Sequence, residues 1–349
     1  MKRIRVLIAD DSATMCTILS SLLAQYPDIE IVGCARDGEQ AVQMAATLLP
    51  HVITMDVQMP RMGGLEAIQR IMETAPSRIL AVCSVQEREV ELSFRAISAG
   101  ALELIAKPEA GPRYDLAGWG QKLVESIRLM AEVPVVRRRH ASTQARASVV
   151  RSGRVEAIAI AASTGGPHAL VTILEALPAT MPVPVLIAQH MAPGFVSGFV
   201  RWLTQVTPMS VVMPRSGDAC RPGHVYLPPD GHDLTVGRGG VLTVTPSSEM
   251  HCPSGDRLLT SVARAYGARA AGLVLTGMGD DGARGLLAIH EANGATLAQD
   301  EESSVVYGMP RAAVEMGATV VQLPLSLIAQ ELLHMTTSSA PAELGGVSQ

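Results

Sequence analysis

One pattern constrains the fold of this chain more than any other. Short apolar runs of strand length alternate with segments whose apolar residues recur at helical spacing. Such alternation is typical of βαβ units, in which parallel strands form a sheet and helices cover its faces. The chain carries two such series, residues 1–128 and 154–336, and its 349 residues are enough for each to bury a core. We therefore predict two α/β domains.

The first series has the element count of a flavodoxin-like domain, whose doubly wound sheet presents the carboxyl ends of its strands at one edge. Five predicted strands alternate with four predicted helices. The strands are Arg5–Ala9, Ile29–Cys34, Val52–Met55, Ile79–Val82 and Leu102–Ile105, and the helices are Ser12–Gln25, Gly38–Leu49, Gly64–Glu73 and Glu87–Ala99.

The second series predicts another doubly wound, mainly parallel sheet with helices on both faces, an α/β/α domain. Within it, paired glycines in residues 234–244 mark a turn between two strand-like segments and indicate a hairpin. The predicted parallel strands are Ala157–Ala162, Val183–Gln189, Val225–Leu227, Ala271–Thr276 and Ala295–Ala298.

Residues 129–153 show neither the strand-length apolar runs nor the helical spacing of apolar residues seen elsewhere, and they are interpreted as a basic flexible linker. Residues 131–154 hold six arginines and one acidic residue, whereas residues 1–130 and 155–349 are both acidic. A nucleic-acid or acidic-surface patch is the alternative interpretation, and the acidic flanks favour a solvated tether. The small, polar residues 337–349 are predicted to be a disordered tail.

Composition excludes several classes of protein. No apolar stretch approaches the ~20 residues that span a bilayer, and the apolar run after the basic first residues is too short for a signal peptide. The five cysteines lack a C-x-x-C spacing, so neither a disulfide framework nor a zinc site is indicated. Aromatic residues make up 3% and leave few platforms for stacking bases. We expect a cytoplasmic protein without membrane insertion or nucleic-acid binding.

Acidic side chains gather at the predicted carboxyl edge of the first sheet. Asp10 and Asp11 follow the first strand, and Asp56 follows the third. Single acids there are commonly helix caps, but three adjacent carboxylates need a cation, and oxygen-only ligands favour Mg²⁺. Lys107, one of three lysines in the chain, follows the fifth strand and could neutralise an incoming phosphoryl group. The pattern predicts phosphoryl transfer to Asp56.

Residues 3–128 resemble the receiver domain of two-component response regulators. The stretch that begins at Asp56, D-V-Q-M-P-R-M-G-G, fits the receiver motif D-x-x-M-P-x-M-x-G. The resemblance implies that Asp56 is the phosphoacceptor and that Asp11, Asp56 and the Gln58 carbonyl bind Mg²⁺. It also implies that Asp10 acts through water or through its charge.

Three positions depart from the receiver pattern. Cys83 stands where receivers carry a Ser or Thr hydroxyl, and a thiol is a weaker donor. Ser84 is adjacent, but strand alternation places it on the other face. Leu104 replaces the usual aromatic residue three positions before Lys107, and Gly63 replaces a common Asp. We expect the phosphorylation chemistry to survive and the relay to the output surface to weaken.

A serine follows the first strand of the second series. The segment I-A-I-A-A-S-T-G-G-P delivers Ser163 into a Gly-Gly turn, and Pro167 suits the first helical position after it. Backbone N–H groups at such a helix start could stabilise an oxyanion. The geometry is of nucleophile-elbow type, although Ala161 breaks a strict G-x-S-x-G. A cap or a phosphate contact is the commoner role of an isolated serine in a Gly turn.

A base and an acid follow two further strands of the same series. His190 ends the predicted strand 183–189, and the pair Asp280 and Asp281 follows strand 271–276. Each residue alone is more often structural, but together they bring a serine, a base and an acid to one sheet edge. The chain order Ser…His…Asp differs from the Ser…Asp…His order of α/β-hydrolases, so that fold is not predicted.

The second half, behind a receiver, is similar to the CheB family of chemotaxis protein-glutamate methylesterases. The similarity lies in the S-T-G-G turn, the Q-H-M strand end, the G-M-G-x-D-G loop and the later stretch Y-G-M-P-R-A-A. It implies Ser163 as nucleophile, His190 as general base and Asp281 as the acid that orients it. The backbone N–H of Met278 would serve the oxyanion, and Asp280 falls on the variable motif position.

This resemblance implies a hydrolase of glutamate γ-methyl esters on methyl-accepting chemotaxis receptors, with a second activity as a protein-glutamine deamidase. Both reactions are acyl transfers to water through a Ser-bound intermediate and need no cofactor. The implied partners are the receptors and a CheA-type histidine kinase. We also expect the unphosphorylated receiver to compete with substrate for the catalytic edge and so to lower activity.

Two alternatives come from other classes of protein. Many receivers carry a DNA-binding output, but residues 155–349 carry 9 basic and 16 acidic residues and lack a basic recognition helix. A non-catalytic signalling adaptor is the other alternative, and the presence of all three triad residues argues against it.

Overall fold

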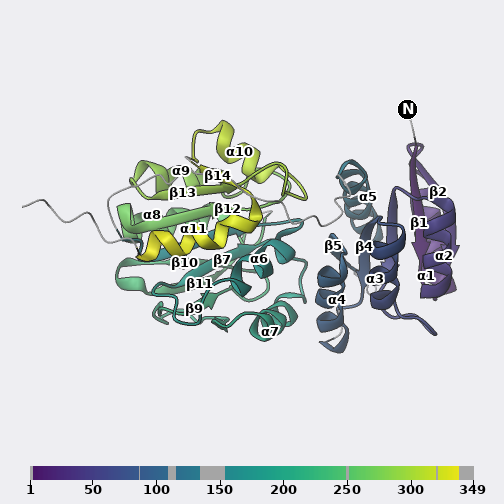
Figure 1. Cartoon of the computed structure of the whole chain (residues 1–349), viewed down its shortest axis with the longest axis horizontal. Coiled ribbons are helices and arrows are strands. Elements are labelled where there is room, and N and C mark those ends of the chain that lie inside the picture. The colour runs from purple at the N-terminus through teal and green to yellow at the C-terminus, as the bar shows by residue number, and fades with distance from the viewer. Residues whose placement is uncertain are drawn as a thin grey trace, which may run out of the picture. The chain divides into compact units, whose positions relative to one another are not determined.

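The computed structural model describes residues 3–85, 87–108, 115–133, 154–248, 251–319 and 321–337. The chain divides into two compact units. The first comprises residues 1–142 together with 192–202, and the second comprises residues 143–191 and 203–349. Each unit contains one parallel sheet with helices packed on it (Figure 1).

The first sheet is a five-stranded doubly wound sheet with the strand order β2-β1-β3-β4-β5, and every neighbouring pair is parallel. This order confirms the flavodoxin-like prediction. Its strands are β1 (Ile4–Ala9), β2 (Ile29–Ala35), β3 (Val52–Asp56), β4 (Arg78–Cys83) and β5 (Glu103–Ala106), and its helices are α1 (Ala13–Leu23), α2 (Gly38–Leu48), α3 (Gly64–Thr74), α4 (Glu87–Ala99) and α5 (Leu116–Glu132).

The chain order of the first sheet reverses direction between β1 and β3, which places their carboxyl ends side by side. Ala9 pairs with Met55 in the parallel register, so the residues that follow both strands share one edge. All five residues of β3 are buried, as expected of a central parallel strand. The Ser12 hydroxyl caps α1 by accepting from the Met15 N–H at 3.2 Å, which starts the helix directly after the acidic pair.

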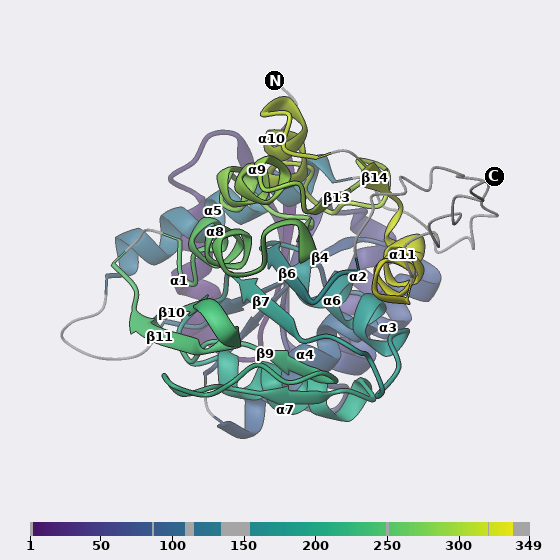
Figure 2. The ribbon, with the colours of Figure 1, turned by 90° about the vertical axis from the view of Figure 1, so that its left-hand side faces the viewer.

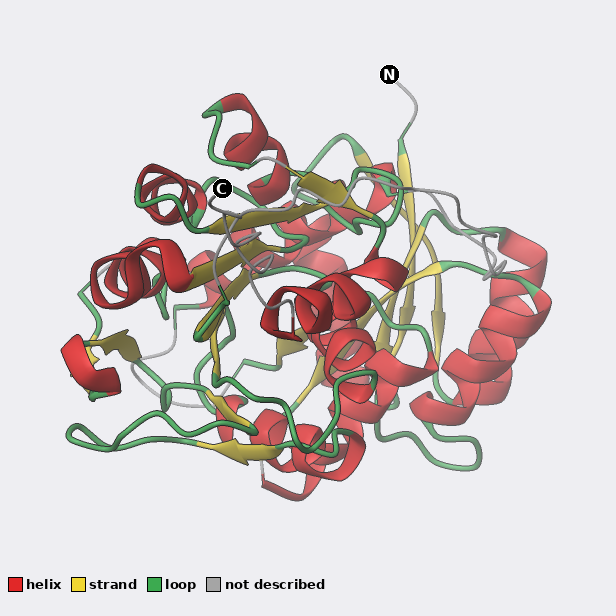
Figure 3. Cartoon of the chain, turned by 60° about the vertical axis from the view of Figure 1, so that its left-hand side comes forward, coloured by secondary structure: helices red, strands yellow, loops and turns green. Residues whose placement is uncertain are grey.

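The second sheet has seven strands in the order β14-β13-β12-β6-β7-β9-β8, and its neighbouring strands are parallel. Helices α8 and α9 cover one face, and α6 and α11 cover the other (Figure 2). Figure 3 shows the strands in yellow and the helices in red. The strands are β6 (Ala157–Ala162), β7 (Val185–Gln189), β8 (Ser210–Val212), β9 (His224–Tyr226), β12 (Ala270–Val274), β13 (Ala295–Gln299) and β14 (Val321–Leu323).

The remaining elements of the second unit connect these strands. The predicted hairpin is present as the antiparallel pair β10 (His232–Val236) and β11 (Leu242–Pro246). The α-helices are α6 (Gly166–Glu175), α7 (Val196–Val206), α8 (Gly255–Tyr266), α9 (Ala283–Glu291), α10 (Met309–Glu315) and α11 (Leu325–Thr337), and the 3-10 helices are η1 (Arg238–Gly240) and η2 (Gly267–Arg269). Helix α7 spans the boundary between the two compact units.

Strand β6 lies between β7 and β12, and the three strands are parallel. The loops that carry Ser163, His190 and Asp281 therefore leave the same edge of the sheet. Ala162 pairs with Gln189, and Ala161 pairs with Val274. Every residue of β6 is buried, because small Ala side chains alternate with Ile beneath helices on both faces.

Several predicted bounds differ from the structure. Helix α5 was not among the predicted elements and continues to Glu132, four residues into the predicted linker, because its apolar face packs at Leu123, Val124 and Ile127. The edge strands β8 and β14 were also missed, since three residues are too few to show a period. Residues 134–153 of the predicted linker and 338–349 of the predicted tail lie outside the described residues.

Across the described ranges, the helices are either too short or too polar to cross a bilayer.

Candidate active site and phosphorylation site

The serine of the second unit occupies a tight turn between β6 and α6. Its N–H donates to the Thr276 carbonyl at 3.1 Å, and its carbonyl accepts from the Gly166 N–H at 2.8 Å. Gly165 adopts φ +79°, and a Cβ there would lie 2.6 Å from the Val305 Cβ, so only glycine suits this turn. Pro167 occupies the first turn of α6 as predicted. Ser163 is thereby held at the helix start, half-buried at the sheet edge.

The His190 imidazole and the Asp281 carboxylate form a hydrogen-bonded pair beside this turn. The His190 Nε2 lies 2.7 Å from the Asp281 Oδ2, and their side chains are 13% and 6% exposed. The neighbouring Asp280 is exposed, so the structure separates the two acids of the motif. Contact through Nε2 leaves Nδ1 as the ring nitrogen that can exchange a proton with another group.

The Asp281 carboxylate is held by the first turn of α8 as well as by the histidine. It accepts from the Gly255 N–H at 2.6 Å, the Asp256 N–H at 2.9 Å and the Ser254 hydroxyl at 3.3 Å. Burial acts to raise the pKa of Asp281, but the bonds from His190 and from the two N–H groups outweigh it and lower the pKa. The carboxylate is therefore charged and fixed in orientation.

Two residues near the pair were not predicted. Asp256 accepts from the Gly282 N–H and the Gly285 N–H, both at 2.9 Å, and so anchors the loop that carries Asp281 to α8. The imidazole of His251 stacks on that of His190 with ring centroids 5.2 Å apart and planes at 17°. The sequence Ser-Gly-Asp at the start of α8 is typical of a helix N-terminus. Its contact with the distant loop that carries Asp281 could not be predicted from the sequence.

Gln189 connects the Ser163 turn to the His190 backbone. Its Nε2 donates to the Ser163 carbonyl at 2.9 Å and to the His190 carbonyl at 2.8 Å. The side chain is 4% exposed, and the amide therefore fixes two backbone segments within a dry layer. In the sequence, Gln189 stands out as the polar residue that ends an otherwise apolar strand, but the sequence alone predicted no role for it.

The loop after β12 approaches Ser163 closely. A Cβ added at Gly277 would lie 2.6 Å from the Ser163 Cβ, so glycine allows this approach. The Gly277 N–H is bonded to the Val306 carbonyl at 3.0 Å, whereas the Met278 N–H has no acceptor within the described parts of the chain. The Met278 side chain is 53% exposed. Of these two N–H groups, only that of Met278 is available to an oxyanion.

Thr276 holds the same loop to the serine turn. Besides its carbonyl bond to Ser163, its hydroxyl donates to the Thr164 carbonyl at 2.9 Å. Its N–H donates to the buried Gln299 Oε1 at 2.9 Å. Among the described residues, the Ser163 hydroxyl makes no hydrogen bond to His190; such catalytic bonds commonly tighten when substrate binds.

The first unit brings its predicted residues together. One carboxylate oxygen from each of Asp10, Asp11 and Asp56 lies within 4.8 Å of the others. The Lys107 ammonium lies 2.6 Å from an Asp56 oxygen and 3.0 Å from an Asp10 oxygen. Oxygen donors at this spacing fit a hard divalent cation such as Mg²⁺. Gln58 is exposed beside them, and its N–H donates to the Asp56 Oδ1 at 3.1 Å.

Burial dominates the electrostatics of the phosphoacceptor candidate. It raises the pKa of Asp56 to about 6, a shift that Lys107 opposes and Asp10 reinforces. For Lys107, burial acts to lower the pKa, but its contacts with Asp56 and Asp10 prevail and raise it. The ammonium therefore stays charged and compensates part of the acidic cluster.

Of the three departures from the receiver pattern, Cys83 and Leu104 lie in strands and Gly63 lies at the start of a helix. Cys83 is buried at the end of β4, and its thiol lies 3.9 Å from the Ile105 carbonyl of the neighbouring strand. Leu104 is half-buried in β5, and Gly63 precedes α3 as its N-cap without a side-chain bond.

Comparison with known proteins finds a matching protein family for each half of the chain. The family of CheB methylesterases matches residues 158–332, and the family of response regulator receiver domains matches residues 6–114. A protein-glutamate methylesterase/protein-glutamine glutaminase of Myxococcus xanthus is 51% identical over 96% of this chain and 94% of its own length. The chain belongs to the CheB methylesterase family. It is therefore a hydrolase that carries a response regulator receiver domain.

Other similarities agree with this placement. A protein-glutamate methylesterase/protein-glutamine glutaminase of Geobacter metallireducens is 43% identical over 95% of this chain and 99% of its own length. The crystal structure of the CheB methylesterase catalytic domain of Thermotoga maritima is 30% identical, with a TM-score of 0.50, and covers 52% of this chain and 100% of that domain.

Proposed function

We propose that this CheB-family chain hydrolyses glutamate γ-methyl esters on methyl-accepting chemotaxis receptors and deamidates glutamine side chains of the same receptors. The observation that carries the proposal is the His190–Asp281 pair at 2.7 Å, beside a serine turn on the adjacent strand. The names of the similar proteins supply the substrate class, a protein glutamate ester or glutamine.

The proposed reaction begins with attack of the Ser163 hydroxyl on the ester carbonyl. His190 takes the hydroxyl proton on Nδ1, because its Nε2 is bound to Asp281, and returns it to the departing methoxide as methanol leaves. Water, activated by the same imidazole, then cleaves the acyl-serine and releases the glutamate carboxylate. The free N–H of Met278 would donate to the oxyanion of both tetrahedral intermediates.

Asp281 supports this reaction without exchanging a proton itself. Its lowered pKa keeps it anionic, so it stabilises the imidazolium that forms when His190 takes a proton. The two N–H bonds from α8 hold the carboxylate still during that charge change. For a glutamine side chain the leaving group is ammonia, which needs the same proton from His190.

We further propose that Asp56 accepts a phosphoryl group from a CheA-type histidine kinase. Mg²⁺ would be held by Asp11, Asp56 and the Gln58 carbonyl, and it would neutralise charge on the transferred group. Asp10 would act through water or through its charge. Lys107 already bridges Asp56 and Asp10 and would bind a phosphoryl oxygen.

Phosphorylation is proposed to relieve an inhibition by the receiver. If the receiver competes with substrate for the catalytic edge, apparent activity scales with the uncovered fraction. A bias of about 1.4–2.8 kcal/mol would hold activity roughly 10–100-fold below its maximum. Residues 152–349 expressed alone should then exceed the unphosphorylated full chain and ignore acetyl phosphate. A fragment less active than the resting full chain would show that the receiver activates the enzyme.

The experiment that tests the hydrolase uses methanol release from a methylated receptor fragment and labelling with a fluorophosphonate. Ser163→Ala should abolish labelling and lower kcat by roughly 10⁴–10⁶. Asp281→Asn should cost on the order of 10⁴, because it disturbs the tautomer and charge of the base. Asp280→Asn is the matched control, since Asp280 is exposed and should lose less than threefold. A damaging Asp280 variant with a mild Asp281 variant would overturn the assignment.

A further inference from the structure

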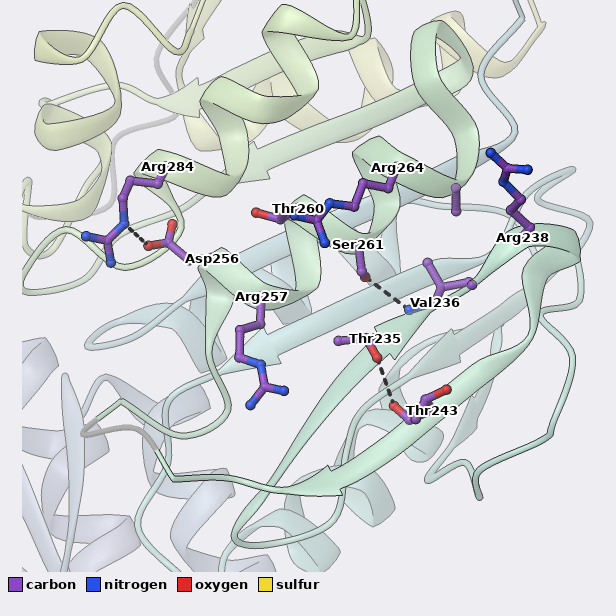
Figure 4. Close-up of a pocket in the computed structure, with 12 residues that line it drawn as sticks. Thr235, Val236, Arg238, Thr243, Asp256, Arg257, Thr260, Ser261, Arg264 and Arg284 are labelled. Carbon is purple, nitrogen blue, oxygen red and sulfur yellow. Dashed lines mark hydrogen bonds and ion pairs between the residues drawn. The ribbon is translucent and has the colours of Figure 1, made fainter.

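A basic hollow lies on the second unit, and Ser163, His190 and Asp281 are not among the residues that line it. It has a volume of about 990 Å³ and opens between α8, the β10–β11 hairpin and the start of α9 (Figure 4). Four arginines line it, and Asp256 is the only acidic residue among the lining side chains. The arginines are Arg238, Arg257, Arg264 and Arg284.

The hollow is rich in positive charge, although the second half of the chain as a whole is acidic. Residues 155–349 contain nine arginines, no lysine and 16 acidic residues. Four of those nine arginines line this one hollow. A net acidic domain that collects nearly half of its cations in one place has a local field suited to anions.

Two of the four arginines have no ion pair with another described residue. Arg257 pairs with Asp233 at 2.7 Å, and Arg284 pairs with Asp256 at 2.8 Å. Within the described portion of the chain, no carboxylate pairs with Arg238 or Arg264. Among the described residues, the hollow therefore presents two guanidinium groups without a carboxylate partner, and guanidinium groups bind carboxylates in a bidentate manner.

The spacing of the arginines indicates an extended anion. Arg257 and Arg264 are seven residues apart on α8, or about 10 Å along the helix axis at 1.5 Å per residue. Arg238 lies in the 3-10 helix beside the hairpin, at the end of the hollow opposite Arg284 (Figure 4). The hollow is open, so one small anion could not contact groups spread over this length. A chain segment with several carboxylates could.

One end of the hollow is joined to the catalytic pair. Asp256 and Arg257 line it, and the same turn of α8 donates the Gly255 and Asp256 N–H groups to Asp281. A protein bound along α8 would therefore extend from the edge of the sheet at which the proposed reaction takes place.

We propose that this hollow binds an acidic segment of the protein substrate, with substrate carboxylates on Arg238 and Arg264. The inference rests on the proposed function, because it places the binding surface of the receptor whose ester reacts at Ser163. Each hydrolysis converts a neutral ester into a carboxylate, so a partly demethylated receptor binds the hollow more strongly than a fully methylated one.

The test is the double variant Arg238→Glu with Arg264→Glu in the full chain. Its KM for a methylated receptor fragment should rise about tenfold, or about 1.4 kcal/mol, while kcat and the hydrolysis of p-nitrophenyl acetate change less than twofold. The matched control is Arg215→Glu with Arg221→Glu, which makes the same charge change at exposed positions outside the hollow and should leave KM within twofold.

Direct binding of polyglutamate provides a second, independent test of the proposed binding surface. Polyglutamate should bind the wild type and compete with receptor, and should bind the double variant at least fivefold more weakly. Equal binding to both proteins, or an equal KM rise in the control pair, would overturn the inference. So would inorganic phosphate competing as well as polyglutamate at equal charge, since this would indicate a small-anion site. A wild type that cleaves p-nitrophenyl acetate but not the receptor would instead contradict the proposed function, and the polyglutamate arm would still decide this inference.

Discussion

The buried Gln189 carboxamide bonds to the backbone of both Ser163 and His190, the proposed nucleophile and its proposed base. We predict that Gln189→Met, which keeps the volume and removes the amide, lowers kcat about 10–100-fold with little change in KM. A displacement of about 1 Å between reacting groups can cost 10²-fold in rate. The two bonds at 2.9 and 2.8 Å join the Ser163 and His190 segments through one side chain, in addition to the backbone bond from the His190 N–H to the Ala162 carbonyl at 2.9 Å.

The effect on stability should be small, and the structure explains why. The Ser163 carbonyl keeps its bond from the Gly166 N–H, so only the His190 carbonyl loses its donor, at about 1–3 kcal/mol. The Gln189 Oε1 is itself buried without a partner among the described residues, and its removal offsets a similar amount. We expect a net loss of unfolding free energy of about 1 kcal/mol, or roughly 2–4 °C in Tm.

Methanol release and urea unfolding, measured on the same samples, separate the two effects. Ile289→Val is the matched control, because Ile289 is a fully buried residue of α9 and the change costs about 0.5–1.5 kcal/mol. It should lower stability by a similar amount and leave kcat unchanged. If Gln189→Met retains kcat within twofold, the carboxamide has no positioning role and the reasoning fails.

Three further predictions concern pH, phosphorylation and the relay. Because the folded-state pKa of Asp281 is lowered, its stabilising contribution is present above the ordinary Asp pKa of 3.8 and is lost as pH falls from there through the lower folded-state pKa. The difference in urea midpoint between wild type and Asp281→Asn should therefore stay constant above about pH 5 and shrink as the pH falls below 3.8. Acetyl phosphate with Mg²⁺ should label the wild type at one base-labile site. Labelling should vanish in Asp56→Asn and fall strongly in Lys107→Ala, because the Lys107 ammonium contacts Asp56. Equal labelling of wild type and Asp56→Asn would contradict the receiver assignment. Cys83→Thr with Leu104→Phe should increase the activation by acetyl phosphate, measured as the ratio of methanol release with and without it, and an unchanged ratio would show that neither position limits the relay.

Much of the architecture could be predicted because parallel sheets leave a strong local signal. A buried strand such as β6 must be a continuous run of apolar residues, and the polar residue that ends the run marks the sheet edge. The receiver cluster followed from the same logic, since Asp10, Asp11 and Asp56 all come directly after such runs.

Short edge elements lacked that signal. Strands β8 and β14 have three residues each, and a period of two cannot be recognised over so few positions. Helix α5 has a clear apolar face at Leu123, Val124 and Ile127 and was missed although the pattern was present.

The sequence by itself determined which side chains reach the catalytic edge, because strand order in a parallel sheet aligns every carboxyl end. Only the tertiary structure decided between the two adjacent acids: Asp281 is buried against His190 and the start of α8, whereas Asp280 is exposed. It also decided that Asp256 accepts from the Gly282 and Gly285 N–H groups and that Gln189 donates to the Ser163 carbonyl, all of them backbone groups distant in sequence. Hydrogen bonds of this kind depend on packing between segments far apart in the chain, and neither residue type nor local period records them.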